Sequence, residues 1–422
     1  MKFLALFDYL ISKIGYLFSA GLCGLPVIGC ANTAELSLPP ADPVPAIVVP
    51  SGFRVQVFAR LGAAGMDYFR GPRFMAFGPD GNLYVSMGMD NKVLMLVDSN
   101  KDGVADQQVM VSDKLNAPQG LAFVDGKLLV ANQDGVVRLE SDNGKWPAIS
   151  QKTLIRDLPS GGHTLKNIKL GPDGYLYINV GSSCNVCVES DPQRATILRY
   201  TTDGKPAGAL LTLGRHAQSP VWARGLRNSQ GFAWDSSDTM FATDNGADMR
   251  SDKKGGKPND ELPPEDLNRI EGGQHYGWPY CWGKQQPDPN FPGDDGFCST
   301  TQPATIEFKA HSTPIGITFL NHSTFPESYK SSAIVALHGS WNREEPSGYK
   351  LVQVKFVQGR ATEVVDFATG WMKDNVAWGR PVDVTVAPDG ALYVTDDRAG
   401  FVYRISYNPD MYKPQVKGKG SK

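Results

Sequence analysis

The feature that most limits how this chain can fold is a hairpin signature that recurs along it. Each copy has an apolar strand, a Pro-Asp-Gly or Asp-Gly turn, and a second strand of β-branched or aromatic residues. Four copies are clear (residues 77–85, 123–130, 170–178 and 386–394) and two are weaker (233–243 and 317–337). The early copies are about 46 residues apart, a period typical of propeller blades. A two-sheet sandwich is the alternative, but it explains the repeat poorly.

Six copies predict an all-β fold, a six-bladed β-propeller over residues 51–410. Residues 52–60 lack a hairpin of their own, and we expect them to pair beside residues 400–407 and close the ring. Long inserted loops are expected within residues 247–314 and 339–377, where function often lies. The formal net charge of −2 gives no electrostatic basis for binding nucleic acid.

The N-terminus has the pattern of an export signal. Lys2 and Lys13 precede an apolar run that ends in Val-Ile-Gly-Cys30, which is similar to a bacterial lipobox. This predicts a signal peptide over residues 1–29, lipidation of Cys30 and a periplasmic, membrane-tethered protein. A plain signal peptide cut later and a retained membrane anchor are the alternatives. Residues 30–50 read as a Pro-rich tether and residues 411–422 as a basic flexible tail.

Four cysteines in the body of an exported chain suggest two disulfides. The simplest pairing joins Cys184 to Cys187 and Cys281 to Cys298, although four cysteines allow three connectivities. Separately, Asp98, Asn100, Asp102 and Asp106 place oxygen ligands at the spacing of a calcium loop, with a solvated turn as the alternative.

Residues 221–282 carry the densest set of candidate site residues. Arg224, Arg227 and Asn228 precede one expected strand, and a second ends in Asp-Asn-Gly246. His163 follows two glycines directly before the third hairpin, where an exposed imidazole could act as a base. The alternatives are arginines that brace loops and a loop histidine with one backbone hydrogen bond.

Together these motifs resemble the glucose/sorbosone dehydrogenase family, six-bladed propellers that use pyrroloquinoline quinone (PQQ) and calcium. The resemblance covers roughly residues 50–408 and depends on G-H before L-G-P-D-G-Y-L-Y, on R-N-S-Q-G-F, on T-D-N-G, on E-D-L-N with H-Y-G-W-P, and on the closing G-R-P-V-D-V with P-D-G-A-L-Y-V-T-D-D. G-S-S-C-N-V-C and H-G-S-W-N-R look more like the sorbosone branch.

The resemblance implies a role for each matching residue. His163 would be the general base that takes a proton from a sugar hydroxyl while hydride passes to the quinone C5. Arg227 and Asn228 would hold the quinone oxygens, where preorganised donors stabilise developing charge. Gln119 would contact the cofactor, and Arg380 would pair with one of its carboxylates.

The resemblance also implies two calcium sites and a cofactor lysine. One calcium would lie at the carbonyls of Gly246 and Ala247 and bridge to PQQ. The other would lie at the residues that match a structural site, namely Glu265, Asp266 and Tyr276. The segment of the cofactor lysine contains both Arg343 and Lys350.

Two positions depart from the family pattern. Val382 stands where a second cofactor arginine is expected. Ser182 replaces an aspartate that orients the base in the glucose branch, and its loss is expected to weaken the base or change its tautomer.

The resemblance implies oxidation of a sugar or sugar-derived aldehyde to a lactone or acid, with electrons leaving to an external quinone or cytochrome. A calcium-dependent hydrolase such as a lactonase, and a non-catalytic carbohydrate-binding propeller, are the alternatives. Convergence of His163, Arg227 and Arg380 on one central cavity favours the oxidoreductase, and scattering favours the binding protein.

Overall fold

The computed structural model describes residues 46–62, 70–210 and 218–409. The chain divides into two units, Met1–Glu35 and Leu36–Lys422, and the fold described here belongs to the second. The expected signal peptide, Cys30 and the basic tail over 411–422 lie outside the described residues. Within the described part, no helix is long and apolar enough to cross a membrane.

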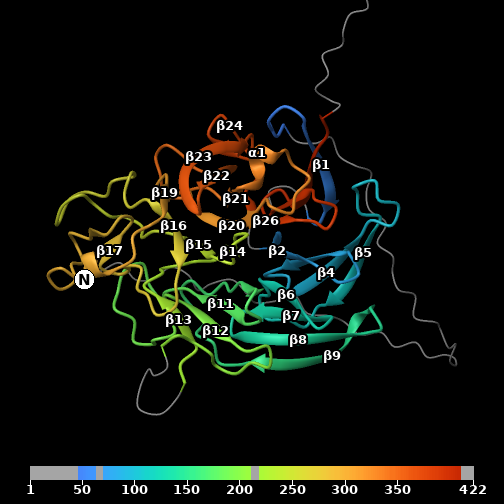
Figure 1. Ribbon diagram of the computed structural model, residues 1–422, viewed down its shortest axis with the longest axis horizontal. Helices are drawn as coiled ribbons and strands as arrows, with labels where there is room; N and C mark the ends of the chain where they lie inside the picture. Colours follow the sequence, from blue (N-terminus) through green and yellow to red (C-terminus); the bar gives the residue numbers. More distant parts are fainter. Residues whose placement is uncertain (1–45, 63–69, 211–217, 410–422) are drawn as a thin grey trace, which may run out of the picture. The chain divides into compact units, whose positions relative to one another are not determined.

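Six four-stranded antiparallel sheets make up the fold (Figure 1). The first three contain, in order, β2 (Pro72–Phe77), β3 (Leu83–Met87), β4 (Lys92–Val97) and β5 (Gln107–Ser112); β6 (Leu121–Val124), β7 (Lys127–Asn132), β8 (Gly135–Asp142) and β9 (Lys145–Ile155); and β10 (Ile168–Leu170), β11 (Leu176–Val180), β12 (Thr196–Tyr200) and β13 (Val221–Arg224).

The last three sheets contain β14 (Phe232–Trp234), β15 (Met240–Asp244), β16 (Glu265–Ile270) and β19 (Ile306–Phe308); β20 (Pro314–Phe319), β21 (Ser332–Leu337), β22 (Lys350–Val357) and β23 (Arg360–Ala368); and β26 (Pro381–Val386), β27 (Leu392–Asp396), β28 (Phe401–Tyr407) and β1 (Phe53–Arg60). The described residues also form a short helix, α1 (Glu327–Lys330), and a 3-10 turn, η1 (Cys298–Thr300).

The sheets are the six blades of a propeller. First strands contact one another around the ring: β2 contacts β6 and β26, β6 contacts β10, and β20 contacts β14 and β26. The third and fourth blades are joined where the Asn167 amide donates to the Gln230 carbonyl at 2.8 Å. β1 pairs with β28, from Phe53 opposite Tyr407 to Arg60 opposite Phe401. The first strand of the described residues therefore closes the last blade, as the sequence predicts.

The Pro-Asp-Gly-x-Leu-Tyr signature has a local physical cause. The Asp80 carboxylate accepts from the backbone N–H of Asn82 at 3.1 Å and from the hydroxyl of Tyr84 at 2.9 Å. In the third blade, Asp173 accepts from the hydroxyl of Tyr177 at 2.8 Å. The glycine after each aspartate has a positive φ, 79° for Gly81, which an L side chain adopts only with strain. The aspartate and glycine together fix the turn.

The tyrosine of the signature also packs against the next blade in edge-to-face geometry. The ring centroids of Tyr84 and Phe123 are 4.9 Å apart, those of Tyr177 and Trp234 are 5.3 Å apart, and those of Tyr393 and Phe77 are 5.2 Å apart. Each pair joins the second strand of one blade to the first strand of the following blade. One sequence repeat thus specifies both the hairpin and the contact between blades.

The two long intervals are only partly insertions. Residues 247–314 contain β16 and β19, and residues 339–377 contain β22 and β23, so each interval supplies the two outer strands of a blade. What remains are loops with two small hairpins, β17 (Cys281–Trp282) with β18 (Gln286–Pro287) and β24 (Met372–Lys373) with β25 (Val376–Ala377).

The described part of the chain contains two disulfides. They join Cys184 to Cys187 and Cys281 to Cys298, which confirms the simplest pairing. At the N-terminal end of the described chain, Val48 exchanges two backbone hydrogen bonds with Thr369. The last residues of the expected tether are therefore attached to the propeller.

Candidate active site

A cavity of about 590 Å³ is formed mainly by residues that precede the first strands or follow the second strands of the blades, together with Arg73 of β2, Ile315 of β20 and Glu265 of β16. Six residues singled out from the sequence line it: His163, Arg227, Asn228, Gly246, Glu265 and Arg380. Three of them, His163, Arg227 and Arg380, come from different blades and still meet at this one cavity. Their convergence is the arrangement that favours the oxidoreductase hypothesis.

The histidine is oriented by the residue that replaces the expected aspartate. His163 Nδ1 lies 2.9 Å from the hydroxyl and 3.1 Å from the carbonyl of Ser182. That hydroxyl donates its own proton to the Cys184 carbonyl at 2.7 Å, so it accepts from Nδ1–H and leaves the lone pair on Nε2. Burial, and then the nearby Arg227 charge, lower the pKa of His163 to about 4. The imidazole is therefore neutral near pH 7.

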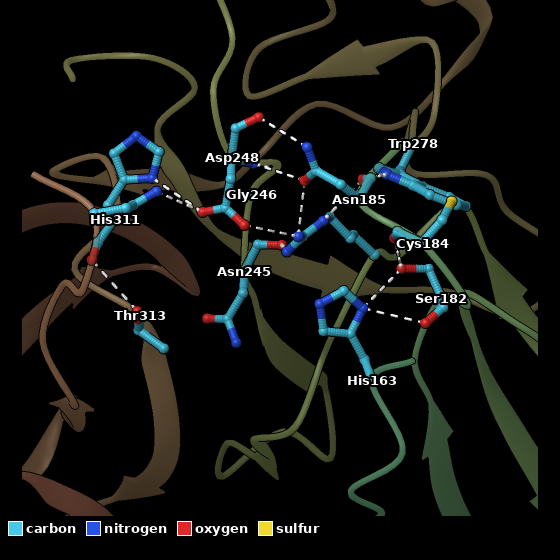
Figure 2. Close-up of polar contacts among 12 residues, drawn as sticks. His163, Ser182, Cys184, Asn185, Asn245, Gly246, Asp248, Trp278, His311 and Thr313 are labelled. Carbon is cyan, nitrogen blue, oxygen red and sulfur yellow. Dashed lines mark hydrogen bonds and ion pairs between the residues drawn. The ribbon is translucent and has the colours of Figure 1, made fainter. Parts of the chain in front are cut away.

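Arg227 is held by oxygens of Asn185, Asn245 and Asp248, the residues that Figure 2 labels around it. Its Nε donates to the Asn185 carbonyl at 3.1 Å, and its Nη1 to the Asn245 carbonyl at 3.2 Å. Its Nη2 donates to Asn185 Oδ1 at 2.9 Å and to Asp248 Oδ2 at 3.2 Å. Asn185 lies in the G-S-S-C-N-V-C segment and Asp248 two residues after T-D-N-G, and the sequence assigns neither a role.

A buried carboxylate shapes the Arg-Asn turn. Asp244 accepts from the backbone N–H groups of Arg227 at 3.0 Å and Asn228 at 2.7 Å. Burial raises the pKa of Asp244 to about 6. The side-chain oxygens of Asn228 and Asn245 are buried and have no hydrogen-bond partner among the described residues. Both residues line the cavity, so a bound ligand or ordered water would supply the missing partner.

Arg380 also lines the cavity and is bound to a second buried polar group, formed by His338, Asp397 and Arg73. Its Nε donates to the His338 carbonyl at 3.1 Å, and its Nη2 to the Gly339 carbonyl. His338 Nε2 lies 3.0 Å from both carboxylate oxygens of Asp397, and the same carboxylate binds Arg73 at 2.6 Å. Sequence reasoning missed Arg73, His338 and Asp397. The paired aspartates in T-D-D, where β27 ends, are the signal that could have pointed to this group.

Beside the main cavity lies a space of about 20 Å³, large enough for one water-sized particle. Gly246, Ala247, Asp266 and Tyr276 are among its lining residues. Asp266 Oδ1 is buried with no hydrogen-bond partner among the described residues. Burial, with the carboxyl groups of Asp244 and Glu307, raises the pKa of Asp266 well above its usual range. An unpartnered buried carboxylate oxygen at a small cavity is the donor that a hard cation binds.

Glu265 lines the main cavity and binds Gly246, which lines both spaces. Its carboxylate accepts from the backbone N–H of Gly246 at 2.6 Å, and burial raises its pKa to about 8. The hydroxyl of Tyr276 donates to the Arg269 carbonyl and accepts from the Glu271 N–H, at 2.8 Å each. That hydroxyl is therefore engaged outside the small space.

Three predicted cofactor residues do not line the main cavity. Gln119 lies behind Arg73, whose Nε donates to the Gln119 side chain at 3.2 Å. Lys350 forms an ion pair with Asp366 at 2.6 Å. Arg343 donates to the Glu261 carboxylate and to the carbonyls of Asp260 and Ala310. Neither Arg343 nor Lys350 is placed to contact a ligand in this cavity.

The Asp-Ser-Asn-Lys-Asp-Gly loop is organised by its own backbone. Asp98 accepts from the N–H of Gly103 at 2.9 Å, and Asp106 accepts from the N–H of Ser99 at 2.6 Å. Asn100 Oδ1 accepts from the N–H of Asp102 at 3.0 Å. Among the described residues, the only group of three His, Cys, Asp or Glu side chains with ligand atoms within 4.8 Å of one another is Cys184, Cys187 and Glu189, and its sulfurs form a disulfide. The loop carboxylates are therefore not gathered around one point.

Val382, in the place of the second family arginine, is fully buried against Phe74 and Ile315. Ile315 also lines the main cavity. This part of the wall is apolar, so the position offers no charged contact.

The sequence model of the TrAA12-like family matches residues 48–408. An uncharacterized protein of Borreliella burgdorferi is 28% identical over 376 residues, covering 85% of this chain and 90% of that protein. A pyrroloquinoline quinone-dependent pyranose dehydrogenase of Coprinopsis cinerea is 24% identical over 415 residues, covering 85% of this chain. The chain spans 54% of the length of that dehydrogenase.

Solved structures share the fold. A family AA12 carbohydrate-active enzyme of Trichoderma reesei superposes with a TM-score of 0.72 at 20% identity, over 86% of this chain and 98% of its own. The holo PQQ domain of the Coprinopsis cinerea pyranose dehydrogenase gives 0.71 at 22% identity, over 88% and 99%. The PQQ-bound aldose sugar dehydrogenase of Streptomyces coelicolor gives 0.58 at 20% identity, over 85% and 100%.

Proposed function

The chain belongs to the TrAA12-like family, and we propose that it is a PQQ-dependent oxidoreductase that converts a sugar or sugar-derived aldehyde to a lactone or acid. Relatives named as PQQ-dependent pyranose dehydrogenase and as PQQ-bound aldose sugar dehydrogenase support this activity. The single observation that carries the proposal is the convergence of His163, Arg227 and Arg380 on one cavity.

The residues present fit the cofactor. PQQ is a planar quinone with three carboxylates, and Arg73, Arg227 and Arg380 bring three guanidinium groups to the cavity wall. The amide oxygens of Asn228 and Asn245 are buried and have no hydrogen-bond partner among the described residues, so they can accept hydrogen bonds from a ligand in this cavity. We expect Arg227 and Asn228 on the quinone side and Arg380 toward a carboxylate.

The chain supplies a base and a cation for the reaction. His163 Nε2, neutral and unprotonated, accepts the proton of the substrate hydroxyl. PQQ, when bound, would supply the two-electron acceptor for the hydride of the substrate carbon that bears this hydroxyl. Arg227, fixed by four hydrogen bonds to oxygen atoms, stabilises the negative charge that develops beside it without having to reorient.

Calcium is the second expected cofactor. A calcium structure of the Trichoderma reesei family AA12 enzyme supports it. The donors in this chain are the Asp266 and Glu265 carboxylates and the carbonyls of Gly246 and Ala247, all at or beside the small cavity. A cation there would pair with the buried Asp266 carboxylate, which otherwise has one oxygen without a partner.

The outer wall of the main cavity suits a small hydroxyl-rich substrate. Asn91, Asn116 and Gln133 contribute amide groups, and Trp341 is an exposed aromatic residue in the same lining. Amides that hydrogen-bond hydroxyls, beside an aromatic face, are the usual elements of such a site. Electrons would then leave to an external acceptor, a quinone or a cytochrome.

The test uses purified protein without residues 1–30, supplied with PQQ in the presence and absence of calcium. Reduction of a dye is followed across aldoses, sorbosone and simple aldehydes. Calcium-dependent turnover on a sugar or aldehyde supports the proposal. Failure of PQQ to bind, or to raise thermal stability, would contradict it and favour the hydrolase or binding alternative.

Export and lipidation remain part of the proposal. The lipobox-like run before Cys30 supports attachment to a bacterial membrane. Mass spectrometry of the full chain expressed in a bacterium should find a lipid on Cys30, and Cys30→Ala should release the protein from the membrane fraction. Recovery of unlipidated wild-type protein would contradict this part.

A further inference from the structure

The Cys184–Cys187 loop lies between the two residues to which the proposed function gives chemical roles, His163 and Arg227. Ser182, two residues before the disulfide, binds His163, and Asn185, inside the disulfide ring, binds Arg227. Figure 2 shows Asn185 between Asp248 and Trp278, with Ser182 facing His163. The proposed function accounts for Ser182 but gives Asn185 and the disulfide no role.

Asn185 uses nearly all of its polar atoms. Its carbonyl accepts from Arg227 Nε at 3.1 Å and from Trp278 Nε1 at 3.2 Å. Its side-chain oxygen accepts from Arg227 Nη2 at 2.9 Å and from the Asp248 N–H at 2.8 Å, and its amide nitrogen donates to the Asp248 carbonyl at 2.9 Å. An exposed residue with five such contacts is held in one orientation.

The fixed orientation of Asn185 in turn fixes the orientation of the Arg227 guanidinium. A guanidinium has five N–H groups. Hydrogen bonds to Asn185, Asn245 and Asp248 use four of them, and Asn185 accepts two. Since the group is planar, two bonds to one residue fix both its plane and its rotation within that plane. One Nη1 N–H is left over for a ligand.

The loop is braced so that Asn185 and Ser182 keep a fixed relation. The Ser182 hydroxyl donates to the Cys184 carbonyl at 2.7 Å, and Glu189 accepts from the N–H and hydroxyl of Ser183 at 2.6 and 2.8 Å. The disulfide closes the four residues that contain Asn185.

We propose that Asn185 is a positioning residue for Arg227, and that the Cys184–Cys187 loop sets the geometry between this arginine and His163. The role rests on the proposed function. Asn185 is not among the residues that line the main cavity, so in this proposal it acts through Arg227. The disulfide is then part of the active-site architecture and not only a clamp on a surface loop.

The test compares Asn185→Ala with Val188→Ala, a matched control at an exposed position just after the same loop. Because Asn185 is exposed, its truncation removes hydrogen bonds without opening a buried cavity, and the thermal midpoint reports whether each variant is folded. Asn185→Ala should lower kcat/KM about 10–100-fold, the usual effect of removing an outer-shell partner, and should raise the Kd for PQQ in titrations of the apo-protein. Val188→Ala should change neither.

A double-mutant cycle with Arg227→Ala separates positioning from general damage. If Asn185 acts through Arg227, then adding Asn185→Ala to Arg227→Ala should cause no further loss in kcat/KM or in PQQ binding. Equal losses in both backgrounds would overturn the inference. If the wild-type protein neither binds PQQ nor reduces dye, the proposed function itself fails, so the two failures are distinguishable. Replacing both Cys184 and Cys187 by Ser should lower kcat/KM and add no further loss to Asn185→Ala, and additive losses would refute the role of the disulfide.

Discussion

His163 is bound through Nδ1 to two oxygens of one residue, the hydroxyl of Ser182 at 2.9 Å and its carbonyl at 3.1 Å. A serine in place of an aspartate keeps the imidazole tautomer but supplies no charge. An imidazolium would therefore have no carboxylate partner on this side, while Arg227 disfavours it on the other. The arrangement favours a neutral base.

This relationship predicts an unusual pH dependence. A base must be unprotonated, so activity falls as the pH falls through its pKa, which burial lowers to about 4 for His163. We expect kcat/KM to show no loss from His163 between pH 8 and pH 5. Ser182→Asp should raise this pKa, because a carboxylate stabilises the imidazolium, and should move the acid limb upward. A wild-type limb near pH 6.5, or a limb that Ser182→Asp leaves unmoved, would contradict this.

Arg380 should matter to cofactor affinity more than to the chemical step. Arg380→Ala removes a guanidinium from the cavity wall, and a hydrogen bond to a charged group contributes about 1.5–3 kcal/mol. The Kd for PQQ should therefore rise by roughly 10–100-fold in equilibrium titrations. Lys350→Ala is the control, because Lys350 pairs with Asp366 away from the cavity. An equal effect of both variants would show that the cofactor lies elsewhere.

Asp266 should determine the response to calcium. The carboxylate is buried among other carboxyl groups, so a cation that binds the folded state stabilises it, by about 2.7 kcal/mol at a hundred times its Kd. Calcium should raise the thermal midpoint of the wild-type protein, and a chelator should reverse the rise. Asp266→Asn keeps the shape and removes the charge, so it should lose most of the response. Asp102→Asn, in the loop at residues 98–106, should keep it.

The tyrosine of the repeat should be a stability residue. Tyr177 packs on Trp234 and donates to Asp173. Tyr177→Phe should cost about 1 kcal/mol, the net value of one hydrogen bond, and Tyr177→Ala about 3–5 kcal/mol, as for other buried aromatic residues. Denaturant unfolding measures both. Near-equal losses would mean that packing between the blades contributes little.

Much of the ring could be predicted because its signals are local. The Asp-Gly turn and the tyrosine four residues after the aspartate lie within one hairpin, so each copy reports its own conformation. The outer strands are less visible in the sequence, because a long loop separates β16 from β19 and because Gln358-Gly359, not an Asp-Gly turn, joins β22 to β23. They were included in intervals interpreted as insertions.

The candidate site also has a part that the sequence predicts and a part that it does not. His163, Arg227 and Arg380 lie next to first strands, and the repeat alone brings them to one end of the ring. Contacts such as Asn185 with Arg227, or His338 with Asp397, join loops 42 and 59 residues apart. They depend on how those loops pack, which no local pattern specifies. Lys350 is a residue that the sequence predicts at the site and the structure places elsewhere. It lies in the segment that matches the family's cofactor lysine, but its side chain pairs with Asp366.

The most direct test of the account is a single-turnover measurement on protein loaded with PQQ and calcium, mixed with a saturating sugar or aldehyde substrate, for the wild type and for His163→Gln. The account predicts that both proteins bind PQQ with similar affinity, and that the variant reduces it about 10²–10⁴-fold more slowly, the usual contribution of a general base. Equal rates in the two proteins, or a wild-type cavity that does not take up PQQ, would contradict it.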